Sequence, residues 1–153
     1  MPLPWEVQKE IYRRDAHAFI FSAVRTKDEH LHFDDHGAVM DSVKPFPDEL
    51  YLRATLDDYL VGARLMKPWD AKYSLEAGTP IEVLQRIWDT RIYFNEKSRH
   101  VMATWLACAY LLWRARSLPN QLLIVQGKRE EDVAPLVFDK DPHVARISFM
   151  EHT

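Results

Sequence analysis

Two cations and two hydroxyl groups lie close together between residues 96 and 104. Lys97, Ser98 and Arg99 are consecutive, and Thr104 follows a few residues later. Cations and backbone N–H groups bind phosphate, and a neighbouring hydroxyl can ligate Mg²⁺. An apolar stretch follows directly, and a helix starting there would present unpaired N–H groups and the positive end of its dipole. These residue types in this order predict a site for the phosphates of a nucleotide.

The segment departs from the usual phosphate-loop pattern G-x-x-x-x-G-K-[ST]. With Thr104 aligned to the final Ser/Thr, Lys97 takes the place of the first glycine, Met102 that of the second and Ala103 that of the lysine. A lysine from the start of the loop can still reach the same pocket, and the backbone N–H cradle does not depend on side chains. The residues alone leave a second interpretation open, a solvated loop ahead of a helix that begins near Thr104.

The elements expected around this loop alternate between strands and helices. Residues 91–95 are β-branched and aromatic and predict a short strand, and residues 101–116 predict an apolar, buried helix. The continuous apolar run 121–126 is typical of a strand buried on both faces of a parallel sheet. Acidic residues after Arg129 predict the first turn of another helix. This order is a βαβα unit, and the loop after its first strand lies where ligands bind.

The first half of the chain is expected to be helical and irregular. Helices are predicted over 5–14, 16–24, 49–66 and 81–88, and loops over 27–47 and 67–79. Asp15 and Asp48 are expected to cap two of these helices, and Pro80 suits the start of a third.

The composition limits the classes to which the chain belongs. Its 153 residues carry 20 Lys and Arg against 23 Asp and Glu, a net charge of −3 that argues against binding nucleic acid through bulk charge. Hydrophobic residues make up 47%, too many for an intrinsically disordered chain. The single cysteine excludes a disulfide framework and favours a reducing compartment. The four glycines argue against a glycine-rich phosphate loop.

No targeting segment or membrane span is expected. Residues 1–6 lack the basic and apolar regions of a signal peptide. The most apolar stretch, Val101–Trp113, would form a helix of about 20 Å, whereas a bilayer core needs ~30 Å. We therefore expect this stretch to be a buried core helix.

The run Lys97–Trp105 resembles the deviant Walker A motif of bacteriophage terminase large subunits, the ATPases of DNA-packaging motors. In that family the loop often begins Lys-Ser-Arg, lacks the usual lysine before the Ser/Thr and continues into an apolar helix that starts Thr-Trp. Gln121–Asp132 is similar to the second strand and following helix of the family, and residues 43–52 resemble the approach to its ATPase core. The three segments match in order, strongly over 90–135 and loosely over 15–66.

The resemblance implies an α/β fold. A helical lead-in over residues 1–89 would be followed, over 90–153, by the first βαβα unit of a P-loop NTPase core with a parallel sheet, incomplete in this chain. The implied activity is ATP binding for phage DNA packaging, and the parent family hydrolyses ATP. The implied partners are double-stranded DNA, the portal protein, the small terminase subunit and further copies of the chain, in the cytoplasm of an infected or prophage-carrying bacterium.

The family also implies a role for individual residues. ATP with Mg²⁺ would be bound by Lys97, Ser98, Arg99, His100, Val101, Met102, Ala103, Thr104 and, less directly, Gln126. Lys97 would contact the β- and γ-phosphates, Arg99 would stabilise the γ-phosphate as the catalytic residue, and Thr104 would ligate the metal ion. Gln126 would stand at the end of the second strand, where nucleotides bind in open α/β sheets.

Two kinds of departure from the family limit these roles. His100 stands where glutamine is common, and Met102 lacks the backbone freedom of the glycine it replaces. No apolar run ending in Asp-Glu, the Walker B element, follows Gln126, and the carboxylates of the family's nuclease domain are missing as well. We therefore expect poor hydrolysis by this chain alone. The alternatives are a truncated, non-catalytic module that binds nucleotide or a partner, and an interaction protein without a ligand.

Structural roles are expected for the other residues that could bind a ligand. The histidines at 30, 32 and 36, near Asp34 and Asp35, are weak candidates for a metal site because their surroundings are loop-like. Packing, rather than base stacking, is expected for Trp69, Trp88, Trp105 and Trp113, and an inert core position for Cys108. Solvated helix ends, rather than DNA contacts, are expected for the arginines at 13, 14, 114 and 116.

Overall fold

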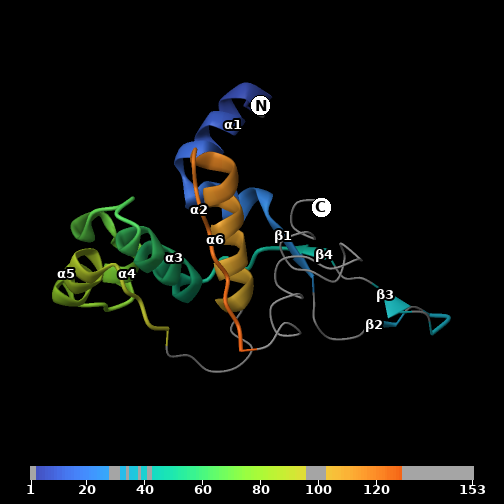
Figure 1. Ribbon diagram of the computed structural model, residues 1–153. Coiled ribbons are helices and arrows are strands. Elements are labelled where there is room, and N and C mark those ends of the chain that lie inside the picture. Colours follow the sequence, from blue (N-terminus) through green and yellow to red (C-terminus); the bar gives the residue numbers. More distant parts are fainter. Residues whose placement is uncertain are drawn as a thin grey trace. The chain divides into compact units, whose positions relative to one another are not determined.

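Helices form most of the regular structure in the computed structural model, which describes residues 3–27, 32–33, 35–37, 39–40, 43–95 and 103–128 (Figure 1). The chain divides into two units, one formed by Met1–Phe46 with Ala107–Thr153 and the other by Pro47–Leu106. In chain order the elements are α1 (Trp5–Arg14), α2 (Ala16–Ala18), the π-helix η1 (Phe19–Ala23), β1 (Arg25–Lys27), β2 (His32–Phe33), β3 (Val39–Met40), β4 (Val43–Pro45), α3 (Leu50–Gly62), the 3₁₀-helix η2 (Pro68–Asp70), α4 (Lys72–Glu76), α5 (Ile81–Thr90) and α6 (Ala103–Ser117).

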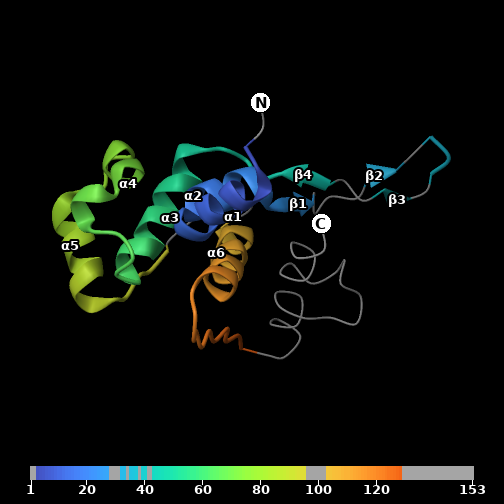
Figure 2. The same cartoon turned by 90° about the horizontal axis from the view of Figure 1, so that it is seen from above.

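The second unit is built around α3. Leu52, Leu56 and Leu60 recur every four residues, so they share one face of the helix and are buried together. α4 and α5 lie beside α3 in Figure 2, and Val61, Leu84 and Ile87 form part of the core between α3 and α5. The helices approach closely at Gly62, where an added Cβ would lie 3.3 Å from Cγ2 of Ile87.

Two carboxyl groups of α3 fix the short helix α4. Oδ2 of Asp57 accepts hydrogen bonds from the backbone N–H groups of Tyr73 (2.9 Å) and Ser74 (3.3 Å), in the first turn of α4. These N–H groups have no partner within the helix, so Asp57 satisfies them from a neighbouring element. The Ser74 hydroxyl donates to Oδ1 of Asp58 at 2.6 Å and lies within hydrogen-bond distance of the Ala54 carbonyl. Side chains from α3 thereby position a helix too short to be stable alone.

The first unit joins the start of the chain to most of α6. β1 and β4 pair antiparallel, with Thr26 opposite Lys44, and β2 pairs antiparallel with β3. From Ala107 onward, α6 buries Ala109, Leu112 and Trp113. The indole Nε1 of Trp113 donates to the backbone carbonyl of Tyr12 at 2.9 Å, which links the end of α6 to α1.

The expected parallel-sheet core is wrong for the described residues. They contain two short antiparallel ribbons, and residues 91–95 and 121–126, expected as parallel strands, form neither strand nor helix. A strand is stable only with a hydrogen-bonded neighbour, and neither run has one. Leu122 and Ile124 are 85% and 77% exposed, the opposite of a strand buried on both faces. The βαβα unit of a P-loop NTPase is therefore not formed here.

The predicted helices are largely confirmed. α1, α3, α5 and α6 occur within a few residues of their expected ranges, and the predicted helix 16–24 is divided into α2 and the π-helical turn η1. Asp15 caps α2 as expected, because its Oδ1 accepts from the N–H of Ala18 at 3.2 Å. Glu49, rather than Asp48, stands at the N-cap of α3, and Asp48 pairs with Arg53. The segments 27–47 and 67–79, expected as loops, contain ribbon strands and the helices η2 and α4, and the helix expected from Arg129 lies outside the described residues.

Candidate functional site

The predicted phosphate loop lies mostly outside the described residues. Lys97, Ser98, Arg99, His100, Val101 and Met102 belong to that part of the chain, and Ala103, Thr104 and Gln126 are described. The described part of α6 spans Ala103–Ser117 and follows Arg99 by four positions in the sequence.

The first turn of α6 separates buried from exposed side chains. Ala103, Trp105 and Leu106 are buried, whereas Thr104 is exposed. The first turn carries no acidic side chain whose negative charge would offset the positive end of the helix dipole. The hydroxyl of Thr104 is exposed in this turn, where the sequence predicts a threonine that ligates the metal ion.

Gln126 does not stand at the end of a strand. It is exposed and belongs to the irregular run 121–127. Its predicted nucleotide contact rested on a place at the carboxyl end of a parallel strand, and the described residues form no such strand there.

The second unit contains a pocket of about 570 Å³ that the sequence does not predict. It lies between α3, the turn after α4 and the segment that follows α5, and is lined by Leu50, Tyr51, Ala54, Thr55, Asp58, Ala77, Thr79, Tyr93, Phe94 and Asn95. We call it the Phe94 pocket. In the sequence, its signal is the run Tyr93-Phe94-Asn95, two aromatic residues and an amide shortly before a cationic segment, whose composition also predicts a strand.

The carboxyl group of Asp58 lies in the wall of the Phe94 pocket and is 8% exposed. It accepts hydrogen bonds from the hydroxyls of Ser74 and Tyr93. Burial raises the pKa of Asp58, and the negative charge of Asp57 adds to this rise, while the two hydrogen bonds oppose it. Burial and the adjacent Asp58 charge also raise the pKa of the Tyr93 hydroxyl, which therefore stays protonated at neutral pH.

Aromatic rings and an amide form the outer part of the pocket. The hydroxyl of Tyr51 donates to Oδ1 of Asn95 across 3.4 Å, and the ring of Tyr93 meets that of Tyr59 edge to face at 5.5 Å. Phe94 is 88% exposed although it lines the pocket. The pocket thus combines a buried acceptor, an amide and an uncovered aromatic face.

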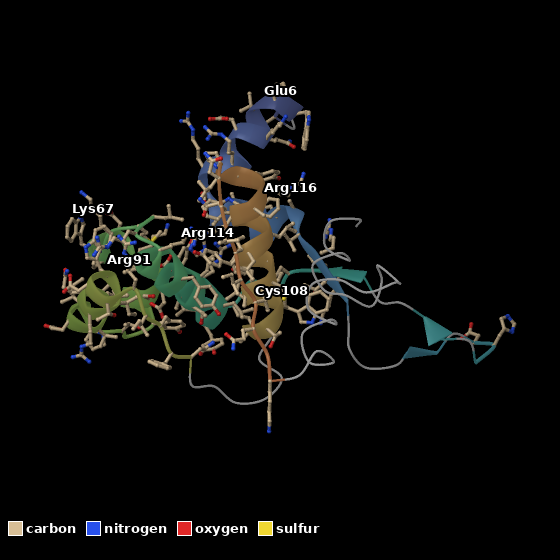
Figure 3. The ribbon with its side chains drawn as sticks, viewed as in Figure 1. Glu6, Lys67, Arg91, Cys108, Arg114 and Arg116 are labelled. Carbon is tan, nitrogen blue, oxygen red and sulfur yellow. The ribbon has the colours of Figure 1, made fainter. Side chains whose placement is uncertain are left out.

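The remaining candidates are mostly structural. Trp105 and Trp113 are buried and Trp88 packs against the core, as predicted, but Trp69 is 64% exposed, with the Lys67 ammonium 5.4 Å from its ring centroid. Cys108 is buried midway along α6, and Figure 3 shows Arg114 and Arg116 towards its end.

No metal site is found in the part of the chain that the structure describes, where no three His, Cys, Asp or Glu side chains gather. His30 and Asp34 lie outside that part, and His36 is exposed. Among the described helices, none combines the length and the apolar character needed to cross a bilayer.

Comparisons with known proteins found no match among protein-family models, curated proteins or solved structures.

Proposed function

We propose that the chain is the N-terminal part of a terminase-like large subunit, and that the segment Lys97–Thr104 binds the phosphates of ATP together with Mg²⁺. The observation that supports the proposal is the helix α6, described from Ala103, four positions after Arg99, with Thr104 exposed near the beginning of its described part. A helix start adds unpaired N–H groups and positive potential to the cations of the loop. The sequence resemblance to the family supports the same site.

Each residue has a separate task in this proposal. Lys97 neutralises the β- and γ-phosphates, and Thr104 supplies a hydroxyl ligand to Mg²⁺. Arg99 stabilises the charge of the γ-phosphate in the transition state, an interaction worth roughly 10³–10⁵ in rate in enzymes that transfer phosphoryl groups. Binding requires only the loop and the helix start, so the proposal makes no use of a parallel sheet.

The wider role follows from the same resemblance. The large subunit would couple ATP hydrolysis to movement of double-stranded DNA through a portal protein, together with a small subunit, in the cytoplasm of an infected bacterium. The chain itself carries the phosphate loop without the Walker B carboxylates. It therefore binds ATP and hydrolyses it poorly, whereas strong Mg²⁺-dependent turnover that Lys97→Ala abolishes would contradict this assignment.

Calorimetric titration of the purified chain with ATP and Mg²⁺ tests the proposal. The wild-type chain should bind, and Lys97→Ala should weaken binding at least tenfold. Lys67→Ala is a matched control, because Lys67 is an exposed lysine of the same unit outside the loop. A folded wild-type chain that binds no ATP, or equal effects of the two substitutions, would reject the phosphate site.

A further inference from the structure

We propose that the Phe94 pocket binds an alkylated ammonium ion, whose charged head lies beside the carboxyl group of Asp58 and against the aromatic rings of the wall. The described lining residues all belong to the second unit, and the volume of about 570 Å³ lies within the range of small-molecule sites. None of these residues belongs to the segment Lys97–Thr104, so the site does not depend on the proposed binding of ATP.

Asp58 brings a carboxyl group into the pocket wall without a cation beside it. It is 8% exposed, and its hydrogen bonds come from the uncharged hydroxyl groups of Ser74 and Tyr93. No Lys, Arg or His side chain among the described residues forms an ion pair with it. Burial raises the pKa of Asp58, because the enclosed carboxylate loses water and gains no opposite charge in return. A cation bound in the pocket would supply that charge.

Aromatic side chains line the same pocket as this carboxyl group, namely Tyr51, Tyr93 and Phe94. Phe94 is 88% exposed and Tyr51 is 39% exposed, so both rings remain accessible to a ligand. The negative face of an aromatic ring attracts a cation, and sites for quaternary ammonium groups combine several such rings. A carboxylate and aromatic rings in one pocket are therefore complementary to an organic cation.

The rest of the described wall favours an alkylated ammonium over a metal ion or a primary ammonium. A metal ion such as Ca²⁺ requires a full shell of oxygen ligands, and a primary ammonium has several N–H groups to satisfy. The amide oxygen of Asn95 already accepts from the Tyr51 hydroxyl. Much of the remaining wall is apolar and consists of Leu50, Ala54 and Ala77. N-alkyl groups pack against such a surface and need no hydrogen-bond acceptor.

Calorimetric titration of the full chain with choline and with its uncharged isostere, in which carbon replaces the ammonium nitrogen, tests the inference. Choline should bind, and the isostere should bind roughly tenfold more weakly or worse, because it neither neutralises the carboxylate nor attracts the rings. A short peptide that carries trimethyllysine is titrated in parallel. Tighter binding of the peptide than of choline would assign the ammonium group to a protein side chain, and weaker binding would assign it to a free ion.

Variants of the pocket separate the contribution of the charge from that of the rings. Phe94→Leu, which keeps an apolar side chain but removes the π-face, should weaken choline binding roughly 2- to 30-fold. Asp58→Asn should weaken it by roughly tenfold or more and reduce the preference for choline over the isostere. Two matched controls should change neither value. Ile92→Ala removes an exposed apolar side chain outside the described lining, and Asp70→Asn neutralises an exposed carboxylate in η2.

The outcomes separate this inference from the proposed function. If a folded wild-type chain binds neither choline nor the peptide, the cation site is rejected, whatever the result with ATP. If choline and its isostere bind equally, or if Asp58→Asn binds choline as tightly as the wild type, the role of the charge is rejected. If Phe94→Leu has no effect, the role of the rings is rejected. Because Phe94 is exposed, its substitution should leave the unfolding midpoint unchanged, which separates lost binding from lost structure.

Discussion

Asp57 and Asp58 are consecutive residues on α3 whose surroundings give them different roles. Asp57 accepts two backbone N–H groups of α4, whereas Asp58 accepts hydroxyl groups and borders the Phe94 pocket. Burial raises the pKa of Asp58, so its charged form is disfavoured in the folded chain. Asp57 contributes instead through the two backbone N–H groups that it satisfies at the start of α4.

Asp58→Asn should remove a pH dependence of stability. Because the folded pKa of Asp58 lies above its ordinary value of 3.8, the folded state binds more protons than the unfolded chain between these two pKa values. The free energy of unfolding therefore falls as pH rises through that window, and Asn, which does not ionise, lacks this fall. Urea denaturation of both proteins from pH 4 to 7 should show the difference growing in favour of the variant as pH rises. A difference independent of pH would contradict the prediction.

Glu10 provides a comparison of opposite sign. The hydrogen bond from Arg13 lowers the pKa of the Glu10 carboxyl to about 2. The stabilising contribution of Glu10 is therefore present above its ordinary pKa and is lost as pH falls towards 2. The Glu10 side chain is 46% exposed, so its ion pairs are in contact with solvent, and Glu10→Gln should have a small effect that salt weakens further.

Thr104→Ala should separate metal binding from folding. The side chain is exposed at the start of α6, so its removal should change the free energy of unfolding by no more than about 0.5 kcal/mol. Under the proposed function, the same change removes a ligand of Mg²⁺ and should reduce the gain in ATP affinity that Mg²⁺ provides. Titrations with and without Mg²⁺ measure this gain, and an unchanged gain would show that Thr104 does not contact the metal ion.

At the scale of elements, a side chain of α3 accepts the hydrogen bonds of the first backbone N–H groups of α4. Asp57→Ala should destabilise the chain by about 1–3 kcal/mol, because two N–H groups of α4 lose their acceptor in a buried place. Asp70→Ala is the matched control, since Asp70 is an exposed carboxylate in the adjacent η2. Urea denaturation monitored by circular dichroism compares the two, and equal losses would exclude the capping role.

The sequence predicts the helices because their signals are local. Leu52, Leu56 and Leu60 mark the buried face of α3 within a few turns, and Asp15 caps α2 by accepting from the N–H of Ala18, three residues away. Strands depend on a partner elsewhere in the chain, so their local composition is a weaker signal. Residues 121–126 have the composition of a buried strand but pair with no strand among the described residues. Conversely, Arg25 pairs with Pro45 across a segment whose composition indicates a loop. Pairing between distant residues is not encoded in the composition of either strand.

One part of the candidate site can be predicted from local sequence, and the other part cannot. The helix predicted over 101–116 follows from the local sequence, and α6 confirms it from Ala103 onward. The Phe94 pocket brings together residues as far apart as Tyr51 and Asn95, from α3 and from the segments that follow α4 and α5. Only the packing of α3, α4 and α5 reveals that these side chains share one cavity.

At the scale of the whole molecule, the segment after α6 exposes apolar side chains. Replacing Leu122 and Ile124 together by Ser should leave the free energy of unfolding within about 0.5 kcal/mol of the wild type, because both side chains are exposed. The same change should raise the concentration at which the chain aggregates, since exposed apolar runs promote association. Light scattering against concentration measures this effect. Leu112→Ser in buried α6 should instead lower stability by several kcal/mol, about 2–5.

The hydrogen bond from Trp113 to Tyr12 connects residues 101 positions apart, and this separation has a consequence during synthesis. The first unit needs both Met1–Phe46 and the chain from Ala107 onward, and the whole second unit is translated between them. At ~5–20 residues per second, the N-terminal segment waits roughly 3–12 s on the ribosome before α6 becomes available. The second unit, which is continuous in sequence, can fold during that interval, so translation itself sets the order in which the two units form.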